Sequence, residues 1–405
     1  MSGTPGDAGR IVVDADGHIL EPGSMWVDYI DPQYRDRAPR VVTQPDGSQA
    51  WVGEGGMPLR GEATAIAGLA GVARWHDLSR PENRLTLKYT DAHPGAFDPL
   101  ERLRVLDAEG IDAAVLYPTW GLYLVKDPPY AAALHQAYNT WLADYCGAAP
   151  DRLFGVGAVP LQDIELAVAE MRRCVRDLGF TAIFIRPNPY MHGRRFPDSC
   201  YDRFWAEAQD LDCVIGLHPV RSDTAMPGAT VAYGLMAPRP EGTSGGGGFI
   251  QPAMWLSHTL DSMVALADFV AGGVLERFPR LRVAVLESSG GWLPSVLEKL
   301  EHHFEYLAWQ RPHLKSRPSE LFKRNCYISF DPDEAMLAPT AQVVGADRIV
   351  WASDFPHPDA FFPGAVTQLR ENLSPLPREA QRQILGENAV RLYRLRRSEG
   401  SRRKG

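Results

Sequence analysis

Carboxylate and imidazole side chains follow short apolar runs at several separate places along the chain. Five of them are of types that bind divalent cations, namely Asp16, His18, His218, Glu287 and Asp354. The spacing of two residues between Asp16 and His18 places both side chains on the same face of a strand. Zn²⁺, Fe²⁺ and Mn²⁺ all accept such ligands, and a carboxylate beside bound water can also take its proton. The pattern therefore predicts a metal site, and Glu287 bears on how many metal ions it holds.

Eight short apolar runs supply the strands that must position these side chains. They are residues 11–15, 113–117, 153–159, 182–185, 213–217, 282–286, 326–330 and 348–352. Continuous apolar runs are typical of parallel strands that are buried on both faces, and amphipathic segments separate them here. Eight such units predict an α/β fold, the (β/α)8 TIM barrel, in which the carboxyl ends of the strands converge on one face. A doubly wound sheet is the alternative, but no GxGxxG follows the first run.

The barrel is expected to form a single domain over residues 11–397, with flexible tails at 1–10 and 398–405. Two long segments, 36–98 and 221–256, interrupt the strand–helix pattern. Insertions of this length on the face of the βα-loops usually shape a substrate pocket or pack on a neighbouring subunit. We therefore expect loop insertions at the mouth of the barrel and a homodimer.

Composition and charge restrict the partners of the chain. The formal net charge of −8 and the pI near 5.8 argue against nucleic acid and anionic membranes. No apolar run approaches 18 residues, and the N-terminus has no apolar signal segment. The five cysteines show no CxxC spacing, which fits reduced thiols. Together these features predict a cytoplasmic enzyme that acts on a small molecule and has no membrane partner.

Four motifs resemble the amidohydrolase-related TIM barrels, a group that includes aminocarboxymuconate-semialdehyde decarboxylase and the resorcylate-type decarboxylases. The motifs are Asp-Ala-Asp-Gly-His-Ile-Leu-Glu-Pro at 14–22, Gly-Leu-His-Pro at 216–219, Phe-Pro-Arg-Leu-Arg-Val at 278–283 and Ser-Asp-Phe-Pro-His at 353–357. The resemblance spans about residues 11–395. It implies that a metal ion is held by Asp16, His18, His218 and Asp354.

The turn after the sixth strand departs from this family pattern. The decarboxylases commonly place a catalytic histidine there, whereas this chain has Glu287. A carboxylate can bind or bridge a second cation, for which Glu21 and His303 are further candidate ligands. With a glutamate at this turn the chain resembles the TIM-fold nonheme diiron monooxygenases of bacterial terpenoid (platensimycin–platencin) biosynthesis. The alternative is that Glu287 only holds another ligand in place.

Three functions follow from these alternatives, and Asp354, Glu287 and His258 are the candidate catalytic residues. The first is a nonheme diiron monooxygenase of antibiotic biosynthesis that uses O₂ and an electron-donor protein to hydroxylate a hydrophobic, terpenoid-like molecule. Its first iron would be bound by Asp16, His18, His218 and Asp354, and its second by Glu21, Glu287 and His303. The second function is a mononuclear Zn or Mn enzyme that decarboxylates an aromatic acid or hydrolyses an ester or lactone. The third is a metal-binding scaffold without turnover.

Four further polar residues near the strand ends carry weaker predictions. His357 is expected to support Asp354 rather than to bind metal. Arg186 could pair with a substrate carboxylate or with an acidic loop residue. Asp331 faces the same mouth or caps a helix, and Asp14 points into the barrel without an assigned role.

Overall fold

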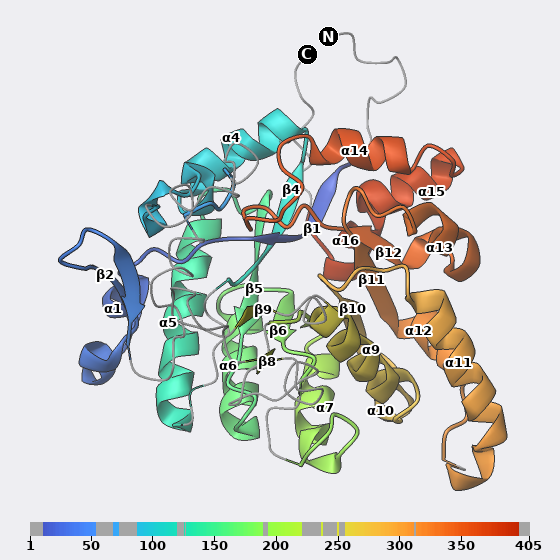
Figure 1. The fold of residues 1–405 in the computed structure, drawn as a ribbon. Helices are drawn as coiled ribbons and strands as arrows, with labels where there is room; N and C mark the ends of the chain where they lie inside the picture. The colour runs from blue at the N-terminus through green and yellow to red at the C-terminus, as the bar shows by residue number, and fades with distance from the viewer. Residues whose placement is uncertain are drawn as a thin grey trace.

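A parallel sheet of eight strands curves into a nearly closed barrel at the centre of the molecule (Figure 1). The computed structural model describes residues 11–53, 68–72, 87–119, 125, 127–188, 193–220, 236–237, 249–250, 256–311 and 313–396. In sheet order the strands are β1 (Val13–His18), β4 (Ala113–Tyr117), β5 (Leu153–Ala158), β6 (Ala182–Ile185), β7 (Val214–Leu217), β10 (Arg282–Val285), β11 (Cys326–Phe330) and β12 (Ile349–Trp351). All eight predicted strands form, and the predicted TIM barrel is confirmed.

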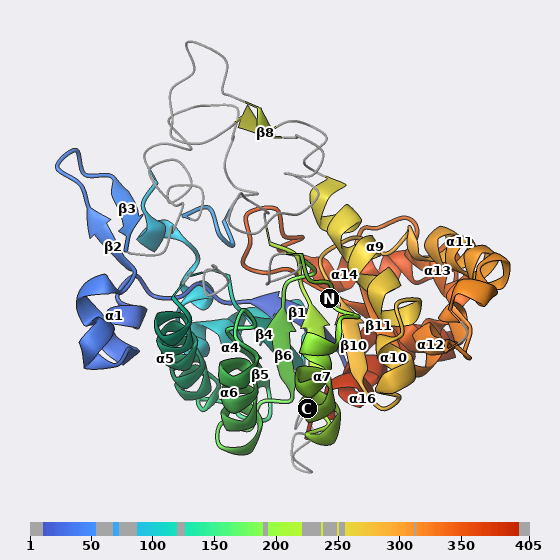
Figure 2. The same ribbon diagram turned by 90° about the horizontal axis from the view of Figure 1, so that it is seen from below.

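Helices surround this barrel, as Figures 1 and 2 show. The α-helices are α1 (Met25–Tyr29), α4 (Pro99–Glu109), α5 (Pro128–Cys146), α6 (Ile164–Arg176), α7 (Asp202–Asp210), α9 (Ser257–Val270), α10 (Val274–Arg277), α11 (Leu293–Tyr306), α12 (Pro318–Asn325), α13 (Leu337–Val344), α14 (Ala365–Asn372), α15 (Arg378–Arg382) and α16 (Asn388–Tyr393). A π-helical turn, Gln383–Glu387, joins the last two. Local sequence signals set several helix ends. For example, the Asp98 carboxylate accepts hydrogen bonds from the first turn of α4, and Gly110 ends that helix at φ 75°.

The predicted insertions are described only in part. Within 36–98 the structure describes the antiparallel hairpin of β2 (Arg40–Thr43) and β3 (Gln49–Val52), together with two short 3₁₀ helices, Tyr89–Asp91 and Pro94–Ala96. Of 221–256, only Leu256 and the two-residue strands β8 (Met236–Ala237) and β9 (Phe249–Ile250) are described. Residues 54–67, 73–86, 221–235, 238–248 and 251–255 and both predicted tails lie outside the described part, so the single domain and the homodimer stay predictions.

Two tyrosine side chains inside the barrel help to hold β1 in place. Tyr393 of α16 donates a hydrogen bond to the Ala15 carbonyl oxygen at 3.0 Å, and its hydroxyl lies 3.0 Å from that of Tyr117. Gly216 makes room for this pair, because a Cβ there would lie 2.4 Å from the Tyr117 hydroxyl oxygen. The C-terminal helix therefore closes the barrel beneath the residues that carry the candidate chemistry.

One stretch of the described residues, Ser257–Arg277, is long and apolar enough to cross a membrane. Half of its most apolar window is buried inside the molecule, and it consists of α9 and α10, which pack against each other and against α12. Core helices of soluble proteins meet the same criteria of length and composition. The stretch is therefore weak evidence for a membrane span, and the cytoplasmic location stays a prediction.

Candidate metal centre

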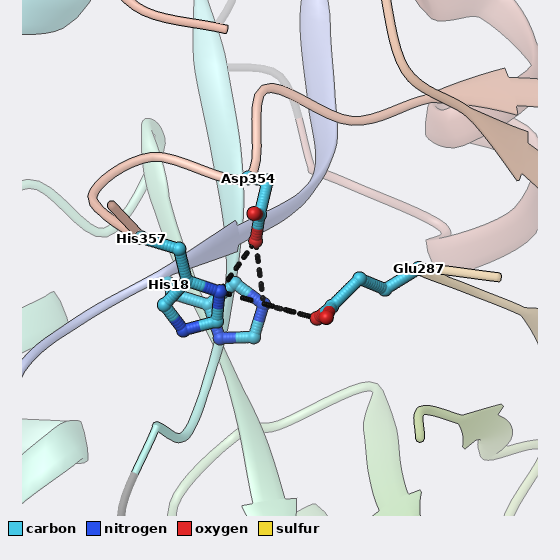
Figure 3. Close-up of side chains that lie close together, drawn as sticks. All are labelled: His18, Glu287, Asp354 and His357. Carbon is cyan, nitrogen blue, oxygen red and sulfur yellow. Dashed lines mark ion pairs between the residues drawn. The ribbon is translucent and has the colours of Figure 1, made fainter. Parts of the chain in front are cut away.

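Five polar side chains from four strand ends meet at the carboxyl end of the barrel. β1 carries Asp16 and ends at His18, and His218 directly follows β7. Glu287 and Asp354 follow β10 and β12. Figure 3 shows the side chains of His18, Glu287, Asp354 and His357 pointing toward one another. The predicted convergence of these strand ends is therefore present.

The ligand-type atoms of this cluster lie close together. The Nε2 atoms of His18 and His218 face each other at 3.0 Å. Asp16 Oδ1 lies 3.8 Å from both of these nitrogens. Glu287 Oε2 lies 2.7 Å from Nε2 of His218, and Asp354 Oδ1 lies 3.5 Å from Nε2 of His18. The two described ligand groups, which share His18, thus contain three carboxylates and three imidazoles, and the third imidazole is that of His357.

The hydrogen bonds of the two imidazoles fix which nitrogen is available. His18 Nδ1 lies 3.2 Å from the Pro118 carbonyl oxygen, and His218 Nδ1 lies 2.8 Å from that of Pro219. A carbonyl oxygen only accepts, so each Nδ1 carries a proton and each neutral ring presents a lone pair at Nε2. Asp16 Oδ1 is also buried, and it accepts no hydrogen bond from the described residues. A divalent cation fits this donor set because it would satisfy these lone pairs together.

Burial and mutual repulsion shift the pKa values of these groups when no cation is bound. Burial raises the pKa of Asp16 well above its usual value, and burial together with the Glu287 carboxylate does the same for Asp354. Burial likewise lowers the pKa of His18 well below normal. Burial alone would lower the pKa of His218, but the Glu287 and Asp16 carboxylates outweigh it and raise the pKa. A bound cation would favour the ionised carboxylates and the neutral rings.

Glu287 connects the cluster to His258 at the beginning of α9. Its Oε1 lies 3.5 Å from Nδ1 of His258. Burial would raise the pKa of Glu287, but His218 and His258 outweigh it and hold the pKa well below normal. Burial would lower the pKa of His258, but Glu287 reverses this and raises it. The structure therefore brings together all three predicted catalytic residues, with Glu287 between two imidazoles.

Two of the clustered carboxylates sit on left-handed backbone. Glu287 has φ 39° and Asp354 has φ 56°, a region that costs a residue other than glycine about 1–3 kcal/mol. The Glu287 turn is held by surrounding polar groups. Its backbone N–H donates to Ser329 Oγ at 3.2 Å, and Gly290 N–H donates to Glu334 Oε2 at 3.0 Å. The surrounding structure therefore maintains a conformation that the residue types alone do not favour.

His357 contacts Asp354 and also belongs to one of the described ligand groups, so its supporting role stays a prediction. Its Nδ1 lies 2.6 Å from Asp354 Oδ1, and its ring stacks on that of His18 with centroids 3.9 Å apart. Its Nε2 lies 3.1 Å from the Thr119 hydroxyl oxygen. Sequence reasoning missed Thr119, which follows β4 by two residues and carries no metal-binding or titratable group.

Two predicted ligands of a second iron lie outside the described ligand groups. Glu21 is buried near the mouth, where its Oε1 accepts a hydrogen bond from the Thr119 backbone at 3.2 Å. His303 lies near the end of α11, and its Nδ1 is 2.9 Å from the Lys299 carbonyl oxygen. Ten residues of helix separate it from the first residue of α11, or roughly 15 Å. The two described ligand groups have His18 in common.

Arg186 and Asp331 also follow barrel strands, β6 and β11, as predicted. Arg186 is buried. The backbone N–H of Asp331 donates to Glu334 Oε1 at 2.9 Å. Burial, followed by repulsion from Glu334 and Glu287, raises the pKa of Asp331 to about 8.

Replacing Asp331 by asparagine should make the stability of the metal-free protein less dependent on pH. Between the ordinary value of 3.8 and about 8, the folded chain holds a proton that the unfolded chain has lost. The free energy of unfolding of the wild type therefore falls as the pH rises through this window. Urea denaturation at several pH values within it should show a smaller fall for the variant. Equal falls would contradict the assignment.

Comparison with known proteins gives one consistent match over most of the chain. The sequence profile of the family described as Amidohydrolase matches residues 13–395. The 2-amino-3-carboxymuconate-6-semialdehyde decarboxylase of Dictyostelium discoideum is 25% identical over 319 residues, which cover 76% of this chain and 79% of that protein. The gamma-resorcylate decarboxylase of a Rhizobium species is 26% identical over 263 residues, which cover 63% of this chain and 76% of that protein.

Solved structures share the fold over nearly the whole chain. An amidohydrolase from Mycobacterium avium subsp. paratuberculosis K-10 has a TM-score of 0.73 at 22% identity, with 95% of this chain and 98% of that chain covered. The 5-carboxyvanillate decarboxylase of Novosphingobium aromaticivorans, solved with manganese and 4-hydroxy-3-methoxy-5-nitrobenzoic acid, has a TM-score of 0.67 at 20% identity, with 98% and 100% covered. At these identities the likeness shows the fold alone.

Proposed function

The chain belongs to the amidohydrolase family, and from this premise we propose that it is a metal-dependent decarboxylase of a small aromatic acid. The observation that carries the proposal is the convergence of two imidazole Nε2 atoms and three carboxylates at the mouth of the barrel. The decarboxylases among its relatives support the reaction class. The manganese in the 5-carboxyvanillate decarboxylase structure supports Mn²⁺ as the metal, with Zn²⁺ as the alternative.

The expectation of a diiron monooxygenase in antibiotic biosynthesis is wrong. The curated relatives that match the chain include a 2-amino-3-carboxymuconate-6-semialdehyde decarboxylase and gamma-resorcylate decarboxylases, which support the alternative reaction instead. The predicted pair of irons, and with it the need for O₂ and an electron donor, rested on Glu287 with Glu21 and His303 as further ligands, and the last two lie outside the described ligand groups. Glu287 contacts His218 and His258 and does not require a second metal to explain its place.

Four residues of the cluster would hold the metal ion, namely Asp16, His18, His218 and Asp354. When bound, a divalent cation supplies positive charge that orients and stabilises a substrate oxygen. Decarboxylation breaks the bond between the ring carbon and the carboxylate, releases CO₂ and requires a proton at that carbon. Asp354 is the group we assign to carry this proton, which its carboxylate would take from water and pass to the ring carbon, and His357 lies 2.6 Å from that carboxylate. Glu287 raises the pKa of His258, which favours an imidazolium that can hold a substrate oxygen.

Hydrolysis of an ester or lactone is the second candidate function, and Glu287 is the observation that favours it. A partly buried carboxylate whose pKa lies well below normal can orient water, and Glu287 occupies the turn where the decarboxylase pattern places a histidine. Anaerobic incubation of the manganese-loaded protein with hydroxylated benzoic acids and with aromatic esters separates the two. Release of CO₂ in equal amount with the decarboxylated product supports decarboxylation. Consumption of esters alone, without CO₂, would replace it by hydrolysis.

Removing the metal should abolish turnover and lower the stability of the protein. A ligand that binds only the folded state stabilises it by about 2.7 kcal/mol at a hundred times its dissociation constant. We therefore expect dialysis against a chelator to lower the melting temperature and to stop CO₂ release, and added Mn²⁺ or Zn²⁺ to restore both. The same chelator treatment of an Asp16→Asn, His218→Ala double variant is the control, which should show no response. Full turnover by protein shown to be metal-free would contradict the proposal.

A further inference from the structure

The barrel has a seam between β1 and β12. These two strands stand at opposite ends of the sheet order, and in the described structure no ladder of strand hydrogen bonds joins them. The seam also separates candidate ligands, because β1 carries Asp16 and His18 whereas Asp354 follows β12. Contacts other than strand pairing must therefore set the distance from Asp16 and His18 to Asp354.

A buried arginine spans this seam on the side of α4. Arg102 is 1% exposed, and its guanidinium donates hydrogen bonds to the main-chain carbonyl oxygens of His18 and Phe355. Both terminal nitrogens lie 3.3 Å from the Phe355 oxygen, and the guanidinium lies 4.6 Å from the centroid of the Phe355 ring. The His18 backbone N–H also donates to the Phe355 oxygen at 2.8 Å. The Arg102 side chain thus joins His18, a candidate ligand, to Phe355, which directly follows the candidate ligand Asp354.

A second contact crosses the seam inside the barrel. Asp14 Oδ1 accepts a hydrogen bond from the Ser353 backbone at 2.9 Å, and Asp14 Oδ2 accepts one from Ser353 Oγ at 2.5 Å. Ser353 Oγ in turn accepts a hydrogen bond from the Phe355 backbone at 3.1 Å. Asp354, with its φ of 56°, lies between these two anchored residues. The backbone on both sides of this carboxylate is therefore tied to β1.

We propose that Arg102 and the Asp14–Ser353 pair form a clamp that replaces strand pairing at the seam and sets the relative position of His18 and Asp354 for metal binding. The proposal rests on the metal site of the proposed function, but not on its reaction. Arg102 and Ser353 are positioning residues, because they contact main-chain oxygens and Asp14 rather than the candidate metal position. A guanidinium suits this role because its fixed fork of donors can bond two carbonyl oxygens at once, which a single ammonium group does less well.

Affinity for Mn²⁺, titrated without substrate and followed by electron paramagnetic resonance, tests the clamp. We expect Arg102→Lys and Ser353→Ala each to weaken Mn²⁺ binding about 10–100-fold, the usual effect of removing groups that orient ligands. Ser353→Ala removes only one oxygen, so it keeps the test valid if Arg102→Lys fails to fold. Melting of the metal-free variants shows how much of the effect is general destabilisation.

Arg282 at the start of β10 provides the matched control. It is also largely enclosed and donates to main-chain oxygens, those of Leu392 and Asp212, but at the opposite end of the barrel. Arg282→Lys should lower the melting temperature and leave Mn²⁺ affinity unchanged. Unchanged affinity in folded Arg102→Lys and Ser353→Ala, an equal loss in Arg282→Lys, or no Mn²⁺ binding by the wild type would each overturn the clamp. A wild type that binds Mn²⁺ but decarboxylates nothing would overturn only the proposed reaction.

Discussion

Replacing Asp354 by asparagine should reduce turnover by about a thousandfold, within the range that general acid–base groups contribute, and weaken metal binding. The amide keeps the shape of the side chain but removes its charge and its transferable proton. Asp354 Oδ1 lies 3.5 Å from Nε2 of His18 and 2.6 Å from Nδ1 of His357, so one substitution affects both the metal and the proton. The rate of CO₂ release at saturating Mn²⁺ and the metal content of the purified variant measure the two effects separately.

Asp331→Asn is the matched control for this substitution. Asp331 follows the neighbouring strand β11 at the same end of the barrel and also has a raised pKa, but it belongs to neither ligand group. We expect the control to keep its metal and most of its turnover. Similar losses in both variants would mean that the acidic environment as a whole matters, and full turnover by Asp354→Asn would remove this residue from the mechanism.

The strands and the convergence of their ends could be predicted because both depend on local sequence. Runs such as Ala182–Ile185 are apolar at every position, which suits strands buried on both faces, and the parallel barrel then brings residues after each strand to one mouth. The residues Asp16, His18, His218 and Asp354 follow from this rule without knowledge of any loop. Their arrangement depends on the fold class rather than on detailed packing.

The contacts that orient these residues could not be predicted from the chain. The hydrogen bonds from Arg102 to His18 and Phe355 join residues 84 and 253 positions apart. A helical pattern shows only that Arg102 lies on α4, and an arginine in such a pattern is usually exposed. The left-handed backbone of Glu287 and Asp354 also depends on the surrounding structure, because residues other than glycine uncommonly adopt it.

His303, a predicted ligand of the second iron, lies outside the described ligand groups. It belongs to α11, which runs from Leu293 to Tyr306, and the helical rise places it roughly 15 Å from the first residue of that helix. Periodicity predicts which residues share a face, whereas distance from the site depends on helix direction.

Glu287→Gln should reduce turnover about a hundredfold or more while leaving most of the bound metal in place. Four other donors remain to hold the ion, so metal content should change little. The loss of the carboxylate removes the anion that raises the pKa of His258, and burial then favours its neutral form. The imidazolium would therefore be lost at lower pH, and the alkaline limb of the pH profile of kcat should move to lower pH.

A shift of the alkaline limb to lower pH would show that Glu287 acts through His258 rather than as a metal ligand. Glu21→Gln is the control, because Glu21 is a buried carboxylate near the same mouth that lies outside the ligand groups; it should leave the metal content and the pH profile unchanged. Loss of metal from Glu287→Gln in parallel with turnover, without a shift of the pH profile, would make Glu287 a ligand. Unchanged turnover would instead show that the two imidazoles act without it, and that the replacement of the family's histidine at this turn has no catalytic consequence.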